Sequence, residues 1–326
     1  MIAELAEGVC SGNTRSLARA ISTIENRRPG YRELVRRLHR NAADSVVVGI
    51  TGSPGAGKST LVDQLIGSYR AAEKTVGVVG IDPASPFSGG AILGDRIRLQ
   101  SSLGDPGVFV RSMSTRGALG GLTPAIHDVI TAYEAFGMDL ILIETVGAGQ
   151  NEIDIVRTAD SVVVVLQPGS GDDVQMLKAG ILEIADILVV NKADMPATDR
   201  TVSQLQEMLH LAADTSGEED RWDPPIVETI ATKGDGISDL VSALERHIGH
   251  LHTTQTYDER RQRRFAAAIT DVLRYDLEAR VEAHLERTAG IEHHARRVAR
   301  RETDPYTIVE ELLAATERVE DLAHEQ

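Results

Sequence analysis

The sequence has almost none of the residues that stabilise secreted domains through covalent links. Its 326 residues include one cysteine, Cys10, so a single chain can form neither an internal disulfide nor a metal site made of several cysteines. Residues 1–10 contain Glu4 and Glu7, whereas a secretory signal would have a basic start and a long apolar core. We therefore expect a reducing, cytoplasmic location.

Long apolar runs and an excess of basic residues are also missing. The apolar stretches, such as residues 46–50 and 162–166, are much shorter than the roughly 20 residues with which a helix crosses a membrane. Asp and Glu outnumber Lys and Arg by 49 to 34, a formal net charge of −15, so most of the surface would repel a nucleic-acid backbone. We expect neither a nucleic acid nor a membrane as a partner.

Between residues 45 and 255, short β-branched runs alternate with helical patterns. The runs read SVVVGI, TVGVVGI, VFVRSM, LILIE, SVVVVL, ILVVN and PIVETI. Such alternation predicts an α/β domain with a mostly parallel sheet and helices on both faces.

Helical patterns flank this core on both sides. Apolar residues from Leu17 to Ile24 recur at helical spacing after a cap at Asn13 or Thr14, and a second short helix is expected near residues 31–40. Residues 1–44 are therefore predicted to be an N-terminal helical extension.

Beyond residue 256 the strand patterns stop, and residues 256–326 are predicted to be a C-terminal helical dimerisation arm. One apolar stripe marks a long helix, and Gly290 and Pro305 punctuate two further helices. The stripe consists of Phe265, Ile269, Val272, Leu273, Leu277, Val281 and Leu285. From the pattern alone, it could pack either on the core domain or on a second copy of the chain.

The histidines of the C-terminal half form two groups. One consists of His247, His250 and His252, and the other of the adjacent His293 and His294. Neighbouring helical residues point in different directions and no cysteine accompanies them, so a surface role is favoured over metal binding.

A glycine-rich segment directly after the first strand pattern has the spacing G-x-x-x-x-G-K-[ST] and precedes a helical stretch. Such a loop wraps phosphates with its backbone N–H groups, its lysine reaches the terminal phosphates, and its serine can bind Mg²⁺. The predicted phosphate-binding residues are Gly52, Ser53, Pro54, Gly55, Ala56, Gly57, Lys58, Ser59 and Thr60.

A second motif is an apolar strand that ends in a carboxylate, Glu144, followed by Thr145, Val146 and Gly147. From this position an acid can reach a magnesium ion beside the phosphate loop. Gly147 could offer its N–H to a γ-phosphate, so the turn could sense that phosphate. Gln150 is available to position the attacking water, although it could equally be a helix-start residue.

The segment Asn191-Lys192-Ala193-Asp194 follows the strand pattern ILVVN. A carboxylate at Asp194 can accept from N1–H and the exocyclic amine of guanine, whereas adenine presents an acceptor there. The stem of Lys192 can lie along the base, Asn191 can bind its opposite edge or brace the loop, and Ala231 can contact the base oxygen. Guanine is therefore the predicted base.

Two further acids are candidates for the metal site. Asp82 ends the second strand pattern, and Asp95 lies in the glycine- and serine-rich stretch that follows. Acids in such loops are often solvated turn residues, but both come close to the expected phosphates. The predicted metal ligands are Ser59, Asp82, Asp95 and Glu144, and the predicted catalytic residues are Lys58, Asp82 and Glu144.

With these motifs in place, the sequence resembles the MeaB/ArgK family of P-loop GTPases, which includes the methylmalonic aciduria type A proteins. The resemblance spans most of the chain. It is carried by GSPGAGKSTL, VGIDPASPFSGGAILGDRIRL, VFVRSMSTRGALGGL, LILIETVGAGQNE, LQPGSGDDVQMLKAGILEIADILVVNKAD and KGDGI.

The resemblance implies a GTP-hydrolysing chaperone, with GTP or GDP and Mg²⁺ as cofactors. It implies that the partner is an adenosylcobalamin-dependent acyl-CoA mutase, usually methylmalonyl-CoA mutase, whose cofactor loading and protection are coupled to hydrolysis. It further implies a homodimer formed through the C-terminal helices, metal-site roles for Asp82, Asp95 and Glu144, and a third switch at residues 167–178.

Two other functions remain open. Some members of the family are named as kinases of periplasmic amino-acid-binding proteins, but the sequence shows no protein-kinase signature. Nickel metallochaperones share the nucleotide motifs, but they usually add histidine-rich or cysteine-bearing segments, and this chain offers only Cys10 before its phosphate loop.

Overall fold

A computed structural model describes residues 1–82, 104–114, 125–145, 155–169, 181–213, 222–287 and 290–324. The chain divides into two compact units, Met1–Phe265 and Ala266–Gln326. The functional boundary that we expect at residue 256 stays a prediction. Within the described residues, no helix is long and apolar enough to cross a membrane.

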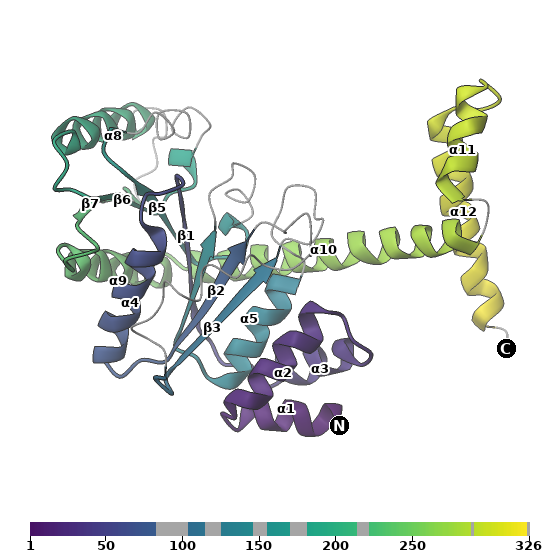
Figure 1. The fold of residues 1–326 in the computed structure, drawn as a ribbon, viewed down its shortest axis with the longest axis horizontal. Coiled ribbons are helices and arrows are strands. Elements are labelled where there is room, and N and C mark those ends of the chain that lie inside the picture. Colours follow the sequence, from purple (N-terminus) through teal and green to yellow (C-terminus); the bar gives the residue numbers. More distant parts are fainter. Residues whose placement is uncertain are drawn as a thin grey trace. The chain divides into compact units, whose positions relative to one another are not determined.

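The first unit contains a seven-stranded sheet in which every neighbouring pair is parallel (Figure 1). Its order is β3-β2-β4-β1-β5-β6-β7. The strands are β1 (Val46–Gly52), β2 (Val76–Asp82), β3 (Val108–Ser114), β4 (Leu140–Thr145), β5 (Ser161–Leu166), β6 (Ile187–Asn191) and β7 (Ile226–Thr229). The α/β class and the parallel sheet expected from the sequence are confirmed.

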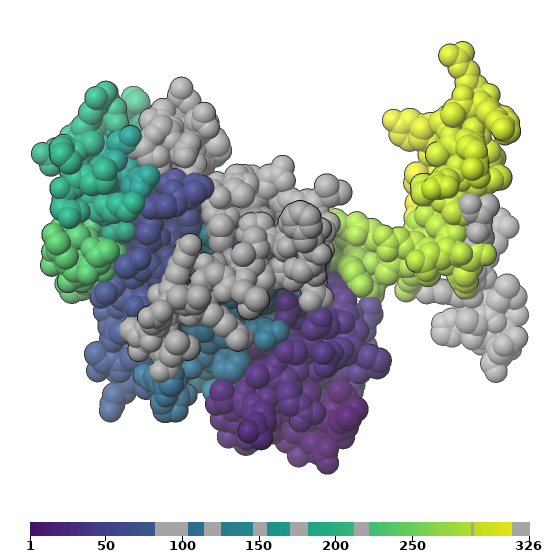
Figure 2. Space-filling view, viewed as in Figure 1, coloured from purple at the N-terminus to yellow at the C-terminus, as the bar shows by residue number. Residues whose placement is uncertain are grey.

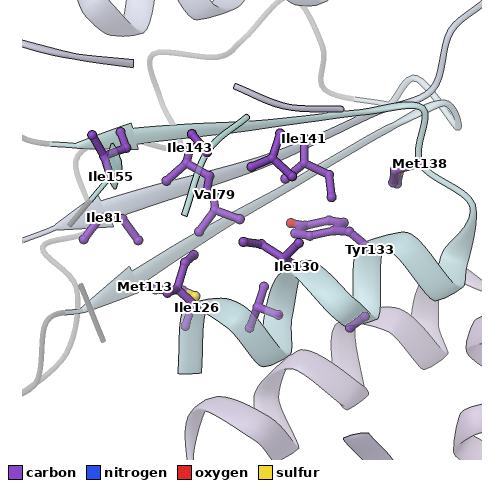
Figure 3. Packing of buried hydrophobic residues seen from close by; sticks show 14 of the residues in the cluster. Val79, Ile81, Met113, Ile126, Ile130, Tyr133, Met138, Ile141, Ile143 and Ile155 are labelled. Carbon is purple, nitrogen blue, oxygen red and sulfur yellow. The ribbon is translucent and has the colours of Figure 1, made fainter. Parts of the chain in front are cut away.

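Helices cover both faces of this sheet (Figure 1). On β4, Leu140 and Leu142 pack with α4 and α9, whereas Ile141 and Ile143 pack with α5 (Figure 3). Alternate side chains of a strand point to opposite faces, so two buried faces explain the unbroken apolar run LILI. The helices are α4 (Lys58–Ala71), α5 (Ala125–Phe136), α8 (Thr198–Ala213) and α9 (Ile237–Thr253), with a short 3-10 turn at Ile181–Glu183.

Three N-terminal helices pack against α5 and lie together in the space-filling view (Figure 2). They are α1 (Ile2–Cys10), α2 (Thr14–Glu25) and α3 (Tyr31–His39). The Asn13 side chain caps α2 by accepting from Ser16 N–H at 2.9 Å, as one of the two expected caps. Helix α1 was not expected from the sequence, and its nine residues would be marginal as an isolated helix. Burial of Leu5, Ala6 and Val9 against its neighbours stabilises it.

The long helix α10 (Thr256–Arg287) runs from the first unit into the second, which also holds α11 (Gly290–Ala299) and α12 (Pro305–His324). Asp304 caps α12 by accepting from Tyr306 N–H at 2.9 Å and from Thr307 N–H at 3.1 Å. Four members of the predicted apolar stripe are exposed on α10. They are Ile269, Val272, Leu273 and Leu277.

The first turns of α10 are tied to the sheet of the first unit by ion pairs at the amino ends of the strands. Arg260 contacts Asp186, which directly precedes β6, at 2.7 Å. Arg261 contacts Asp44 at 2.6 Å. Helix α10 therefore begins as part of the first unit.

The Asp186 carboxylate lies among several polar partners at this edge. It accepts from Val162 N–H at 2.8 Å and from both terminal nitrogens of Arg260, and His247 Nε2 lies 3.2 Å away. Burial by itself would raise the pKa of Asp186, but Arg260 and His247 lower it to about 2. His247 is fully buried, and its Nδ1 lies 2.9 Å from Ser161 Oγ. The expected surface role is therefore wrong for this histidine, because its helix turns the ring toward the sheet.

Arg264 occupies the other buried ion pair of this edge. Its Nη2 donates to Glu134 Oε1 at 2.9 Å, and its Nη1 lies 3.9 Å from Asp160 Oδ1. All three side chains are at most 5% exposed. Burial raises the pKa of Glu134 and of Asp160, and the effect of Arg264 only partly opposes it. The two acids therefore depend on Arg264 for compensation of their charge.

We predict that Arg264→Met lowers the free energy of unfolding by about 3–5 kcal/mol at neutral pH, because two buried carboxylates lose their partner. The measurement is urea denaturation followed by circular dichroism. A raised pKa means that the folded state takes up protons at a higher pH than the unfolded chain. Lowering the pH from 8 to 5 should therefore reduce the difference in free energy of unfolding between the unmodified protein and Arg264→Met.

The matched control is Arg263→Met, one residue away on the same helix. Arg263 is exposed and contacts Glu259 at 3.4 Å, so its loss should change stability by less than about 1 kcal/mol. Equal destabilisation by both variants, or a deficit for Arg264→Met that grows as the pH falls, would contradict the buried-pair interpretation.

Candidate functional site

The predicted site residues within the described part of the chain lie at the carboxyl edge of the sheet. Strands β1, β4, β6 and β7 end there at Gly52, Thr145, Asn191 and Thr229 (Figure 1). Strand β1 lies between β4 and β5 in the sheet. After β1 the chain goes to β2 on one side of it, and after β4 it crosses to β5 on the other side. Ligands of parallel α/β sheets bind at such a reversal of strand order.

The glycines that frame the phosphate-type loop are sterically required. Gly52 has φ 138°, and a Cβ atom there would lie 2.0 Å from the carbonyl oxygen of Val165. Gly57 has φ 92°, and a Cβ atom there would lie 2.4 Å from Asn191 Nδ2. Both positions combine a left-handed backbone with a close neighbour, so only glycine fits.

Lys58 is the first residue of α4 and is 6% exposed. Its ammonium group bends back over the loop and donates to the carbonyl oxygens of Gly52 at 2.7 Å and Ser53 at 2.9 Å. The loop therefore holds a buried positive charge at a helix N-terminus, where the free N–H groups also favour an anion. This arrangement suits bound phosphates.

Ser59, in the first turn of α4, and Glu144, near the end of β4, meet beside Lys58. Ser59 Oγ donates to Glu144 Oε1 at 2.6 Å, and Glu144 is 9% exposed. Thr145 fixes the end of β4 by donating to Thr51 Oγ1 at 2.9 Å. A hydroxyl and a carboxylate are oxygen donors of the kind that Mg²⁺ accepts, so this pair fits the expected ion.

Asn191 is 3% exposed and braces three segments with one amide. Its Nδ2 donates to the carbonyl oxygen of Ala56 at 2.7 Å. Its Oδ1 accepts from Thr229 Oγ1 and from the N–H of Ala231, each at 3.1 Å. In this structure the Ala231 N–H thus bonds to Asn191, and its contact with a base oxygen stays a prediction.

Lys192 and Asp194 are the other side chains of the predicted base-binding segment. Lys192 Nζ donates to the carbonyl oxygen of Gly55 and to Gln167 Oε1, both at 2.8 Å. Asp194 is half exposed, and its Oδ2 accepts from Lys233 Nζ at 3.4 Å. The Asp194 carboxylate therefore lies at an accessible position, next to a loop that carries a cation.

The structure thus brings together the phosphate-type loop, Glu144, Asn191, Lys192 and Ala231. Asp82 is the last residue of β2, at the same edge, but its side chain lies outside the described part of the chain. Asp95, Gly147 and Gln150 lie outside the described residues altogether.

Three further residues contact the site. Thr229 and Lys233 were not predicted as site residues, and Gln167 was predicted only as the start of the third switch. Gln167 directly follows a strand pattern, Thr229 lies at the end of another, and Lys233 begins the KGDGI segment. Their place in the sequence could be read from these patterns, but their hydrogen-bond partners could not, because the partners depend on the strand order.

Comparison with known proteins gives consistent matches over most of the chain. The family described as methylmalonyl Co-A mutase-associated GTPase MeaB matches residues 17–286. A protein of Pyrococcus abyssi that is named as a GTPase is 46% identical over 313 residues, 96% of each chain. The methylmalonic aciduria type A homolog, mitochondrial, of Caenorhabditis elegans is 31% identical over 276 residues, 80% of this chain and 69% of that one.

Among solved structures, the crystal structure of a LAO/AO transport system kinase superposes with a TM-score of 0.67. It is 23% identical in sequence and covers 97% of both chains. At this identity the likeness concerns the fold alone.

We predict that Asp194→Asn changes the preferred base. The amide replaces one acceptor by a donor, so guanine loses a charge-assisted bond and its amine faces another amine. GTP affinity should fall by about 30- to 1,000-fold, or about 2–4 kcal/mol. Xanthosine triphosphate has an oxygen in place of that amine and should bind better. Competition binding with both nucleotides measures the two effects.

The control is Asp199→Asn, an exposed acid in the first turn of α8, which should leave both affinities unchanged. Unaltered GTP binding by Asp194→Asn, without competition from xanthosine triphosphate, would show that Asp194 does not read the base.

Proposed function

This chain belongs to the MeaB family of methylmalonyl-CoA mutase-associated GTPases, and we propose that it is the GTP-hydrolysing chaperone of an adenosylcobalamin-dependent acyl-CoA mutase. The chain is a GTPase. In the proposed function, the nucleotide cycle is coupled to loading and protection of the mutase cofactor. The family match, over most of the chain, is the observation that carries the proposal, and methylmalonyl-CoA mutase is the proposed partner.

Hydrolysis is assigned to the residues around Lys58. Its buried ammonium would neutralise the charge that develops on the terminal phosphates, and the N-terminus of α4 would add to that effect. Ser59 and Glu144, with Asp82 and Asp95 as further candidates, would hold Mg²⁺, which supplies additional charge neutralisation when bound. Asp194 would select guanine, while Asn191 keeps the base-binding and phosphate loops in register.

The kinase and nickel-chaperone functions have no specific observation in their favour. The superposition with a protein titled as a LAO/AO transport system kinase concerns the fold. Among the described residues, no group of three or more His, Cys, Asp or Glu is arranged to hold a metal ion.

We further propose that a second copy of the chain covers the exposed stripe of α10. Ile269, Leu273 and Leu277 follow one another at intervals of four residues and are 69%, 58% and 44% exposed. Contiguous apolar surface of this kind usually marks an interaction site. A stripe along one helix is self-complementary when two copies meet about a two-fold axis, and the family resemblance also implies a homodimer.

Addition of methylmalonyl-CoA mutase should accelerate GTP hydrolysis, we predict by about tenfold or more. Docking would act through the predicted third switch at residues 167–178. A partner that inserts an arginine gives more, about 10³–10⁵. Phosphate release is measured with and without the mutase from the same organism. Lys58→Ala should stay inactive in both conditions, which controls for contaminating GTPases. Equal rates with every acyl-CoA mutase of that organism would refute the proposed partner.

The dimer is tested best by substitution within the stripe, since truncation near residue 255 would also remove Arg260 and Arg264. Ile269→Glu with Leu273→Glu should weaken self-association by about 100-fold or more, because the interface would bury unpaired charges. Light scattering over a range of concentrations measures this change.

Glu278→Lys, on the opposite side of α10 by helical spacing, is the control and should leave the dimer intact. A dimer that persists in the double variant would refute the role of the stripe.

A further inference from the structure

One contact of the candidate site has no role in the function proposed so far. Gln167 directly follows β5, and Lys192 directly follows β6. The two strands are parallel neighbours, with Leu166 paired to Val190, so both side chains start from the carboxyl edge. Gln167 Oε1 accepts from Lys192 Nζ at 2.8 Å.

The backbone of Lys192 is held in an unfavourable conformation. Its φ is 60°, in the left-handed region that residues other than glycine seldom occupy. Such a conformation persists where the surrounding contacts impose it. The N–H of Ala193 donates to the carbonyl oxygen of Thr229 at 3.0 Å, and Asn191 is bonded on both sides of its amide. The start of the lysine side chain is therefore fixed.

The far end of the same side chain is fixed as well. Lys192 Nζ has two acceptors, the carbonyl oxygen of Gly55 in the phosphate loop and the amide oxygen of Gln167, each at 2.8 Å. Gly55 lies in a loop that must carry the phosphates, whereas Gln167 follows a core strand. Of the two acceptors of Lys192 Nζ, Gln167 is therefore the one that is attached directly to the sheet.

A long lysine side chain that is anchored at both ends loses most of its rotational freedom before any ligand binds. Its aliphatic stem then presents a preformed apolar wall between Asp194 and the phosphate loop. A side chain that is already ordered lowers the entropy cost of ligand binding, so the ligand should dissociate more slowly.

We propose that Gln167 is a positioning residue for the guanine nucleotide, because it holds Lys192 in the conformation that covers the base. This inference rests on the proposed guanine site formed by Lys192 and Asp194. Removal of the Gln167 side-chain carbonyl leaves Lys192 bonded to the phosphate loop alone. Nucleotide release then becomes faster, while the chemistry at Lys58 and Glu144 is untouched.

The experiment measures dissociation of fluorescent GDP from the full-length protein by stopped flow, without any mutase. Gln167→Leu keeps the approximate size of the side chain and removes the acceptor. It should accelerate release by about 3- to 30-fold, the loss expected for a hydrogen bond to a charged, half-buried donor. Gln167→Glu retains an oxygen acceptor and should release GDP at the unmodified rate or more slowly.

Three further variants separate positioning from a general loss of structure. Gln206→Ala, an exposed glutamine of α8, should leave the rate unchanged. In a Lys192→Met background, where there is no ammonium to hold, Gln167→Leu should have no additional effect on release. A double-mutant cycle of the GDP release rates of the unmodified protein, the two single variants and the double variant gives the coupling between Gln167 and Lys192 directly.

The outcomes distinguish this inference from the proposed function. Equal GDP release by Gln167→Leu and the unmodified protein, or an equal acceleration by Gln167→Leu in the Lys192→Met background, would overturn the role of Gln167 and leave the GTPase function intact. Failure of the unmodified chain to bind guanine nucleotide would instead overturn the proposed site. Acceleration by Gln167→Leu that Gln167→Glu does not share supports the inference.

Discussion

The geometry of the site depends first on the amide of Asn191. This one group is bonded to the phosphate-type loop through Ala56, 135 residues away in sequence, and to Ala231, 40 residues away. It is buried, so water cannot replace either contact without cost. The close contact between the Asn191 amide and the loop also leaves no space for a side chain at Gly57. The distance between the loop that would hold the phosphates and the segment that would hold the base is thereby fixed before a nucleotide binds.

The two edges of the sheet have different chemistry, and the difference follows from the direction of the strands. All strands are parallel, so one edge collects carboxyl ends and the loops that carry glycine, lysine and asparagine. The other edge collects amino ends, where Asp160 and Asp186 each directly precede a strand. Both carboxylates accept from backbone N–H groups of neighbouring strands, and Arg260 of α10 bonds to the Asp186 carboxylate and to the carbonyl oxygen of Asp160. The buried charges of the second edge anchor a helix, and they leave the first edge free for a ligand.

The candidate site collects three lysines although the chain as a whole is acidic. The chain carries a net charge of −15, which opposes the approach of an anion. Lys58 is buried within its loop, Lys192 bonds across to the same loop, and Lys233 lies beside Asp194. Three cations from separate parts of the sequence therefore lie near the expected position of a nucleotide. A bound triphosphate would interact mainly with these nearby charges rather than with the average charge of the molecule, because salt screens interactions beyond about 10 Å.

The sequence by itself determined the elements and the motifs that are local in the chain. Seven apolar runs specified seven strands, because a strand buried on both faces is continuous in sequence, and GSPGAGKS specified the loop before α4, because its spacing is set by the turn itself. The tertiary structure alone decided the order of those strands, the stability of α1, the burial of His247 and the partners of Asn191. It also decided that Gln167 meets Lys192 and that Arg264 meets Glu134, 25 and 130 residues apart. Local periodicity reports which face of an element is buried, but a contact between distant side chains exists only after packing has placed their elements side by side.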